Sequence, residues 1–349
     1  GGTLMAAGGA LRVPARTGGL SRAGRRALGL VALTALGVAV AFTAVALQRG
    51  QPGAAGTPYW AALLGGLLLA VLAAARLSLA SADAPEDPAG GALVSRLQRV
   101  LPVATVPFVL LLTWEGLVLG FRVPPGIFPS VASIGQALVR SWPVLVADAY
   151  LTFVREVLFG FALGLLLGFV TGTLIAFSTF LRRGFLPLAT AFGAVPIVGL
   201  APVLGRALGV DWESKAAVGV IVTFFPVVLN TVQGLTSVEP LKLELLRSYA
   251  ARPLQGFLAL RLPNALPYVF TSLKVAIVLT VVSVIVAEFL IPGPPSGLGQ
   301  RISLSAHRGQ FDVVFAAIFV SSVLSMLLYW TVQLLERWLL AWHPSSRGG

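Results

Sequence analysis

The sequence of 349 residues contains no cysteine, only two histidines and few charged residues. The lack of cysteine excludes disulfide bonds, thiolate metal sites and thiol catalysis. Charged residues make up 11% of the chain, whereas hydrophobic residues make up 57% and the mean hydropathy is +0.90. This balance does not suit the surface of a soluble protein, so the composition predicts a membrane protein.

The sequence also lacks residues that would supply energy or catalysis. The phosphate-binding pattern GxxxxGK[ST] is absent, and none of the three lysines follows a glycine. A proton-coupled carrier is expected to bury a relay of Asp, Glu or His, but His307 and His343 fall near the ends of apolar runs. No paired nucleophile and base and no metal-ligand spacing occur. We therefore expect neither an enzyme nor an ion-driven carrier, and any ATP would be hydrolysed by another polypeptide.

Apolar runs near the roughly twenty residues that cross a bilayer recur along the chain. Each must be helical, because lipid offers the backbone no hydrogen-bond partner. The sequence therefore predicts an all-α polytopic membrane protein of about eight spans, with a six-helix body that follows a two-helix N-terminal hairpin. The predicted spans are 27–47, 59–79, 101–121, 150–178, 185–208, 215–235, 265–291 and 311–342.

The basic residues predict the orientation of these spans. With the N-terminus inside, the internal segments hold more than twice as many lysines and arginines as the external segments. This bias places the loop 239–261 in the cytoplasm and explains the net charge of +12 without nucleic-acid binding. The first apolar run is longer than the about 7–15 residues of a signal-peptide core, so a retained span is favoured over a secretory signal peptide.

Composition also suggests boundaries between segments. Pro, Gly, Asp and Glu cluster at 81–99, which is typical of a linker. The predicted order is a basic cytoplasmic tail at 1–26, the extra hairpin at 27–80, the linker at 81–99, a transmembrane body at 100–343 with a cytoplasmic loop at 237–263, and a tail at 344–349.

Glycines and prolines mark two parts of the body. Gly160, Gly164, Gly168 and Gly172 are spaced by four, so they line one helix face that another backbone can approach closely. Simple helix packing explains this face, and sliding between conformations is the functional alternative. Pro187, Pro196 and Pro202 interrupt the fifth span and Pro226 interrupts the sixth, a pattern that suits either a pathway or the fitting of helices together. The candidate pathway residues are Pro196, Pro202, Pro226, Asn230 and Glu288.

Ionisable residues within the spans are few: Glu115, Arg155, Glu156, Lys274 and Glu288. Each costs about 2.5–3.5 kcal/mol at the bilayer centre unless it is paired or near an interface. Because Arg155, Glu156 and Glu288 fall near the external ends of their spans, we expect them at the membrane interface.

The loop after the sixth span holds two predicted helices. Pro240 suits a first helical turn, with Ser237 or Glu239 near its start. Leu241, Leu245, Leu246 and Tyr249 would share one face, which fits either a helix on the membrane surface or a helix that binds a partner's groove. Pro253 ends this helix, and a second segment, 254–262, is expected to stop at Pro263.

The run ELLRSYAARPLQGFLALRLPNALP at 244–267 resembles the EAA motif of permeases of type I ABC importers, closest to the nitrate, sulfonate and taurine branch. The resemblance covers roughly 128–342. It includes FPS at 128–130, GFALGLLLG at 160–168, LRRGFLPL at 181–188, VPIVGLAPVLGRALG at 195–209, FFPVVLNTVQG at 224–234, VAEFL at 286–290 and SGLG at 296–299.

The resemblance implies a permease of a bacterial plasma (inner) membrane importer for a small organic nutrient or anion. It implies two ATPase subunits that carry the ATP and Mg, a second permease subunit that is expected to be identical, and an extracytoplasmic substrate-binding protein. This chain itself would bind no cofactor. The ATPase-docking residues would be Glu244, Leu245, Leu246, Arg247, Tyr249, Ala250 and Arg252. The alternatives are a permease that does not import and a membrane scaffold whose loop recruits a partner.

Two positions depart from the EAA pattern. Leu245 and Leu246 stand where the motif has alanines, and Ala250 stands where it has glycine. Because alanine in a left-handed turn costs on the order of 1 kcal/mol, we expect the first helix of the loop to continue to about Arg252.

Overall fold

The computed structural model describes residues 22–49, 51, 53, 55–82, 92–193, 197–291, 293 and 296–342. Every regular element in these ranges is helical, which confirms the predicted all-α class. Seven helices among the described residues are long and apolar enough to cross a membrane. The contacts divide the chain into two units, 1–123 and 124–349.

The first unit consists of α1 (Arg22–Arg49), α2 (Thr57–Ala82) and α3 (Ala92–Gly120). The backbones of α1 and α2 meet at Gly37 and Gly66, where an added Cβ atom would lie 2.6 Å from the facing backbone. An ion pair of 2.6 Å joins Arg49 to Glu115, which satisfies the charge on a buried carboxylate of α3. The third predicted span thus packs with the hairpin in this unit, while the placement of a linker at 81–99 stays a prediction.

The second unit holds the remaining elements. These are α4 (Val131–Arg140), α5 (Trp142–Ala149), the π-helix η1 (Tyr150–Leu158), α6 (Phe159–Phe177), α7 (Thr179–Gly193), the 3₁₀ turn η2 (Ile197–Leu200), α8 (Ala201–Leu208), α9 (Trp212–Thr236), α10 (Pro240–Ser248), α11 (Pro253–Gly256), the π-helix η3 (Phe257–Arg261), α12 (Leu262–Leu290), α13 (Leu298–His307) and α14 (Phe311–Leu339).

The predicted fifth span, 185–208, is not a single helix. Its sequence is divided between α7, η2 and α8, with Pro187 inside α7 and Pro202 in the first turn of α8. A proline lacks the backbone N–H and restricts the residue before it, so repeated prolines favour helix breaks. Pro196 lies outside the described residues.

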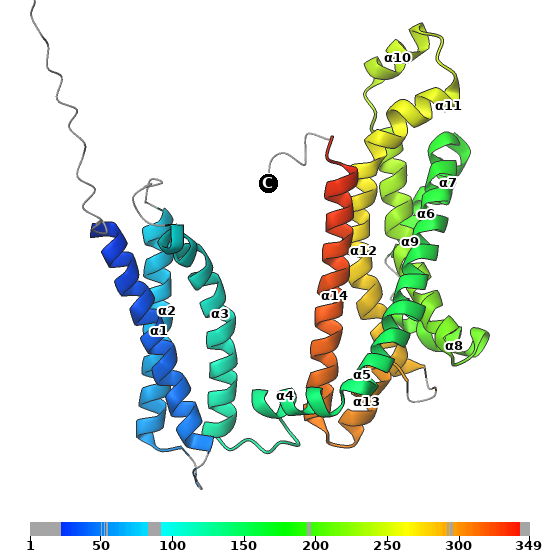
Figure 1. The fold of residues 1–349 in the computed structure, drawn as a ribbon. Helices are drawn as coiled ribbons and strands as arrows, with labels where there is room; N and C mark the ends of the chain where they lie inside the picture. Colours follow the sequence, from blue (N-terminus) through cyan, green and yellow to red (C-terminus); the bar gives the residue numbers. More distant parts are fainter. Residues whose placement is uncertain are drawn as a thin grey trace, which may run out of the picture. The chain divides into compact units, whose positions relative to one another are not determined.

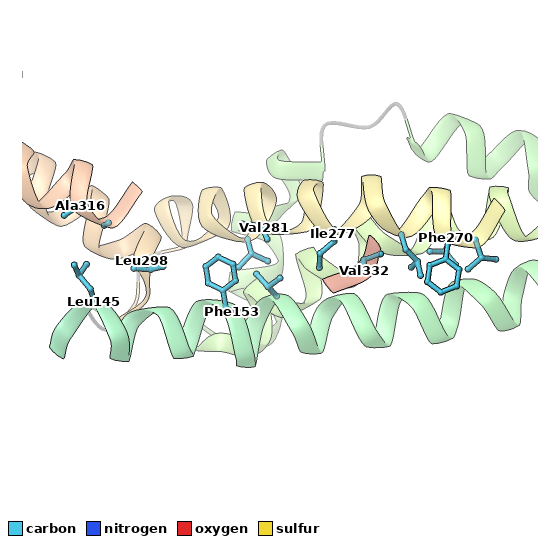
Figure 2. Packing of buried hydrophobic residues seen from close by; sticks show 14 of the residues in the cluster. Leu145, Phe153, Phe270, Ile277, Val281, Leu298, Ala316 and Val332 are labelled. Atoms are coloured by element: carbon cyan, nitrogen blue, oxygen red, sulfur yellow. The ribbon is translucent and has the colours of Figure 1, made fainter. Parts of the chain in front are cut away.

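The core of the second unit forms where η1 and α6 run along α12. Leu145 points toward Leu298 and Phe153 points toward Val281, while Ile277 continues the buried row along α12 (Figure 2). All five side chains are buried. Burial of an apolar side chain away from water stabilises a fold by about 1.5–3 kcal/mol, but the gain is smaller when the alternative is contact with lipid. Close packing of these side chains, rather than exclusion of water, therefore holds the helices together.

The glycine face of α6 packs on α9, which runs beside it (Figure 1). Gly160, Gly164, Gly168 and Gly172 are all buried. A Cβ atom at Gly160 would lie 2.6 Å from the carbonyl oxygen of Ala216. The glycines therefore allow two helix backbones to touch, as the four-residue spacing predicts, whereas sliding along this face stays a prediction.

Candidate functional site

Helix α10 lies beyond the ends of α9 and α12, at one end of the second unit (Figure 1). None of its residues is buried. The apolar side chains of Leu241, Leu245 and Tyr249, each four residues apart, are 68%, 56% and 76% exposed. This exposed apolar stripe is the type of surface that a partner's groove covers.

Two charged side chains of α10 are available beside this stripe. Among the described residues, Glu244 and Arg247 have no ion-pair partner, whereas Glu239 pairs with Lys242 at 3.2 Å. Glu239 stands at the N-cap position without a side-chain capping bond, and Pro240 occupies the first turn, as the sequence predicts.

The end of α10 corrects one prediction. The helix ends at Ser248, and Ala250 adopts a left-handed conformation with φ 52°. The N–H of Ala250 donates to the carbonyl of Arg247 at 2.9 Å, and the N–H of Ala251 donates to the carbonyl of Leu246 at 3.1 Å. These two bonds form a Schellman motif, which satisfies helix-end carbonyls and offsets the strain at alanine. The motif thus supplies the turn that glycine usually makes, and the prediction that the helix continues to Arg252 is wrong.

The second helical segment of the loop also differs from its prediction. It begins at Pro253 but does not stop at Pro263, because α11, η3 and α12 form one continuous helical stretch, Pro253–Leu290. The π-helical turn η3 comes directly before Pro263 and widens the helix there, which relieves the clash of a proline ring with the preceding turn.

The base of the loop is fastened to the body. The side-chain amide of Asn264 donates to the carbonyl of Gly234 at 2.8 Å and to the hydroxyl of Ser237 at 2.9 Å. The Phe177 ring at the end of α6 contacts Phe257 and also lies under the Arg261 guanidinium, 5.2 Å from the ring centroid. The base of the loop is therefore joined to α6, α9 and α12. Sequence reasoning missed Asn264, although the asparagine directly after Pro263 was a signal.

A polar cluster lies at the opposite end of α12, where α13 begins. Asp148 of α5 accepts hydrogen bonds from the Gly297 N–H at 3.1 Å and from Arg301 Nε at 2.7 Å. Thr152 of η1 accepts from the Leu298 N–H at 2.9 Å and donates to Glu288 at 2.8 Å. We define the polar cluster as Asp148, Thr152, Glu288 and Arg301.

The polar cluster explains the SGLG sequence at 296–299. Gly297 has φ +102°, and a Cβ atom there would lie 1.9 Å from Glu288 Oε1. The N–H of Gly299 donates to the other Glu288 oxygen, and a Cβ atom at Gly299 would lie 2.6 Å from that oxygen. Without side chains at these two positions, the first amides of α13 can reach side chains of α12 and η1, which satisfies N–H groups that a helix start leaves free.

The side chains of Glu156 and Glu288 are 1% exposed and lie inside the protein, whereas Arg155 is exposed. Their position at the depth of the membrane interface stays a prediction. The four-residue spacing of Asp148 and Thr152, which brings them to one side of a helix, was the sequence signal for this cluster.

The candidate pathway residues lie on different elements. Pro202 is exposed on α8, and Pro226 and Asn230 lie on α9, where the Asn230 amide donates to the Pro226 carbonyl at 2.9 Å. Glu288 belongs to the polar cluster. Their role in a pathway stays a prediction. The described ranges contain no group of three or more His, Asp or Glu side chains that could hold a metal ion.

An apolar groove of about 650 Å³ runs between α12 and α14. Its walls include Val278, Val282 and Phe289, and its polar lining comes from Ser322, Ser325 and other hydroxyl side chains. No charged side chain lines it.

Comparison with known proteins adds to this geometry. Residues 164–341 match the family described as "Binding-protein-dependent transport system inner membrane component". The chain is 29% identical to a probable ABC transporter permease protein of Haemophilus influenzae, over 69% of this chain and 96% of that protein. It is 32% identical to the riboflavin transport system permease protein RibX of Chloroflexus aurantiacus, over 70% of this chain and 90% of that protein. It is 34% identical to the formylaminopyrimidine transport permease protein ThiX of Halalkalibacterium halodurans, over 48% of this chain and 66% of that protein.

Proposed function

Because the chain belongs to the family of binding-protein-dependent transport system inner membrane components and is a multi-pass permease subunit of an ABC importer, we propose that α10 docks it on a cytoplasmic ATPase. The observation that carries this proposal is the uncovered stripe of Leu241, Leu245 and Tyr249. An apolar stripe that the chain itself leaves exposed is typical of a surface that a partner covers.

In this proposal each side chain of α10 has a separate role. Leu245 and Tyr249 enter an apolar groove of the ATPase, and Leu246 supports them from the half-buried side of the helix. Glu244 and Arg247 pair with charges on the rim of that groove. The left-handed turn at Ala250 sets the angle between α10 and the fastened base of the loop, and Arg252 begins the next helical segment.

The contacts at the base of the loop couple ATP binding by the ATPase to the transmembrane helices. Two ATPases that bind ATP and Mg close on each other, and the loops of two permease subunits, which we take to be identical, move with them. Asn264 and Phe177 pass this displacement to α9, α12 and α6. Tighter binding of ATP by the closed state is the free energy that shifts the permease between its conformations.

We propose that the cargo is a small organic nutrient or anion, which an extracytoplasmic binding protein delivers. The relatives transport riboflavin and formylaminopyrimidine by name. The groove beside α14 holds hydroxyls but no charge, so selection for a particular anion would reside in the binding protein. The basic bias of the sequence supports a cytoplasmic position for the N-terminus and α10.

Co-purification with the ATPase subunit of the same transporter tests the docking proposal. We expect the wild-type chain to retain the ATPase and the double variant Glu244→Lys/Arg247→Glu to lose it. The matched control is Glu239→Lys/Lys242→Glu, which reverses an ion pair internal to the same helix and should retain the ATPase. Equal retention by all three chains would place the docking surface elsewhere. A chain that never binds the ATPase and shows no ATP-dependent uptake in vesicles would favour a scaffold.

A further inference from the structure

We propose that the groove between α12 and α14 is a binding site for an uncharged, ring-shaped molecule that carries N–H donors. The two helices run side by side and contact each other (Figure 1). This site rests on the proposed function and adds to it, because it defines the chemical class of the cargo. Three properties of the groove carry the proposal: its size, its hydroxyl groups and its lack of charge.

The groove is large enough for a small organic molecule. Its volume of about 650 Å³ falls within the range of about 300–1,000 Å³ that is typical of sites for such molecules. Its lining on α12 extends from Val278 to Phe289, about 16 Å along the helix axis. The wall on α12 is aliphatic except for the Phe289 ring, and α14 adds the ring of Tyr329. Apolar walls with aromatic rings favour a flat, ring-shaped ligand.

Hydroxyl groups of α14 offer acceptor atoms to such a ligand. The Ser321 hydroxyl donates to the Ala317 carbonyl at 2.8 Å, and the Ser322 hydroxyl donates to the Ile318 carbonyl at 2.8 Å. A hydroxyl has only one donor hydrogen, so these two oxygens remain available to the groove as acceptors. A ligand that forms hydrogen bonds with them must therefore supply the donors.

Two further hydroxyls of α14 lack a partner. Ser325 and Tyr329 line the groove and form no hydrogen bond with another described residue. Ser322, Ser325 and Tyr329 are spaced by three and four, so they share one side of the helix. A polar group among apolar side chains costs free energy unless it is hydrogen-bonded, and a lipid chain offers no partner. The row of hydroxyls thus favours a polar ligand over a lipid chain.

The groove has no counter-charge for an ion. No charged side chain among the described residues lines it. One turn from Val278, at the end of the groove toward α10, Lys274 of α12 pairs with Glu336 of α14 at 2.8 Å. These two charges satisfy each other and leave neither for a ligand. An ionic ligand would enter apolar surroundings unpaired, which is unfavourable, so the groove suits an uncharged molecule.

Equilibrium dialysis of the full-length permease in lipid nanodiscs tests the site, with empty nanodiscs as the blank for partition into lipid. The first probe is quinazoline-2,4-dione, an uncharged bicyclic molecule with two N–H groups. Its 1,3-dimethyl derivative has no N–H group, and 2-naphthoate is a bicyclic anion of similar size. We expect saturable binding of the first probe. Loss of two hydrogen bonds should weaken binding of the dimethyl probe at least about fivefold.

Variants of the groove show where the probe binds. Ser322→Ala/Ser325→Ala should weaken binding of quinazoline-2,4-dione at least about fivefold, after which the two uncharged probes should bind with similar affinity. Val282→Trp should fill the groove and abolish binding of both. The matched control is Ser272→Ala, because the Ser272 hydroxyl also donates within its own helix, to the Val269 carbonyl at 2.7 Å, but does not line the groove. It should bind the probes as the wild type does.

Three results would overturn the proposal. Absence of saturable binding to the wild type would show that lipid or a second copy of the chain fills the groove. Equal affinity for the two uncharged probes, or tighter binding of 2-naphthoate, would show that the ligand class is wrong. Binding that Val282→Trp leaves unchanged would place the site elsewhere. Retention of the ATPase by the same preparations tests the docking role of α10 separately, so a chain that retains the ATPase but binds no probe contradicts only the groove.

Discussion

The contact between α6 and α9 predicts a large difference between two glycine-to-alanine substitutions. Gly164 faces α9, where an added Cβ atom would lie 2.7 Å from both the Val220 carbonyl oxygen and Thr223 Cβ. Gly184 lies on α7, is exposed, and has no heavy atom within 4 Å of an added Cβ atom. Both substitutions add one methyl group within a helix, so Gly184→Ala is a matched control.

The two substitutions share one energetic contribution and differ in another. Alanine favours a helix over glycine by about 0.8–1.0 kcal/mol, which applies to both variants. Overpacking a tight interface costs about 1–3 kcal/mol, which applies only to Gly164→Ala. We therefore expect Gly184→Ala to be neutral or stabilising by up to about 1 kcal/mol, and Gly164→Ala to be less stable than this control by about 1–3 kcal/mol.

Equilibrium unfolding in mixed micelles, followed by circular dichroism and tryptophan fluorescence, measures this difference. Equal free energies of unfolding for the two variants would refute the backbone contact. ATP-driven uptake measured on the same variants separates packing from sliding. A Gly164→Ala chain of unchanged stability that no longer transports would show that the glycine face serves motion as well as packing.

Three further perturbations test other contacts. Ala250→Gly should stabilise the end of α10 by about 0.5–1 kcal/mol, seen as slower amide hydrogen exchange there, while Ala251→Gly should not. Thr280→Val should lower the free energy of unfolding by about 1–3 kcal/mol, because it leaves the buried Thr223 hydroxyl without its partner at 2.8 Å. In a double-mutant cycle, Thr223→Val/Thr280→Val should lower the free energy of unfolding by less than the sum of the two single variants. Gly297→Ala should destabilise the chain by about 2–6 kcal/mol in chemical unfolding, since backbone strain and overpacking add.

The sequence predicted those features that depend on local chemistry. Apolar length predicts the helical class, glycine spacing predicts the close face of α6, and Pro240 predicts the start of α10. Each of these follows from the residues of a single helix. The family resemblance rested on ordered blocks of such local features, and the match over 164–341 confirmed it.

Features that depend on contacts between distant segments were not predicted. Thr152 and Glu288 are 136 positions apart in sequence, so only the fold shows that their side chains are hydrogen-bonded. The turn at Ala250 was missed because propensity argues against alanine there, while the two compensating hydrogen bonds arise only once the chain turns back. Pro263 does not end the helix because a π-helical turn, which residue types do not predict, precedes it.

Helix α12, Leu262–Leu290, can act as a lever. At 1.5 Å per residue, its 29 residues extend about 44 Å, longer than the hydrocarbon thickness of about 30 Å. The hydrogen bond of Thr280 to α9 lies along its length, and Asn264 and Glu288 lie toward its two ends. A tilt of about 10° around the middle would carry each end roughly 4 Å, in opposite directions. Inward motion of the loop end would therefore appear at the far end as outward motion of Glu288, with no intermediate part between them.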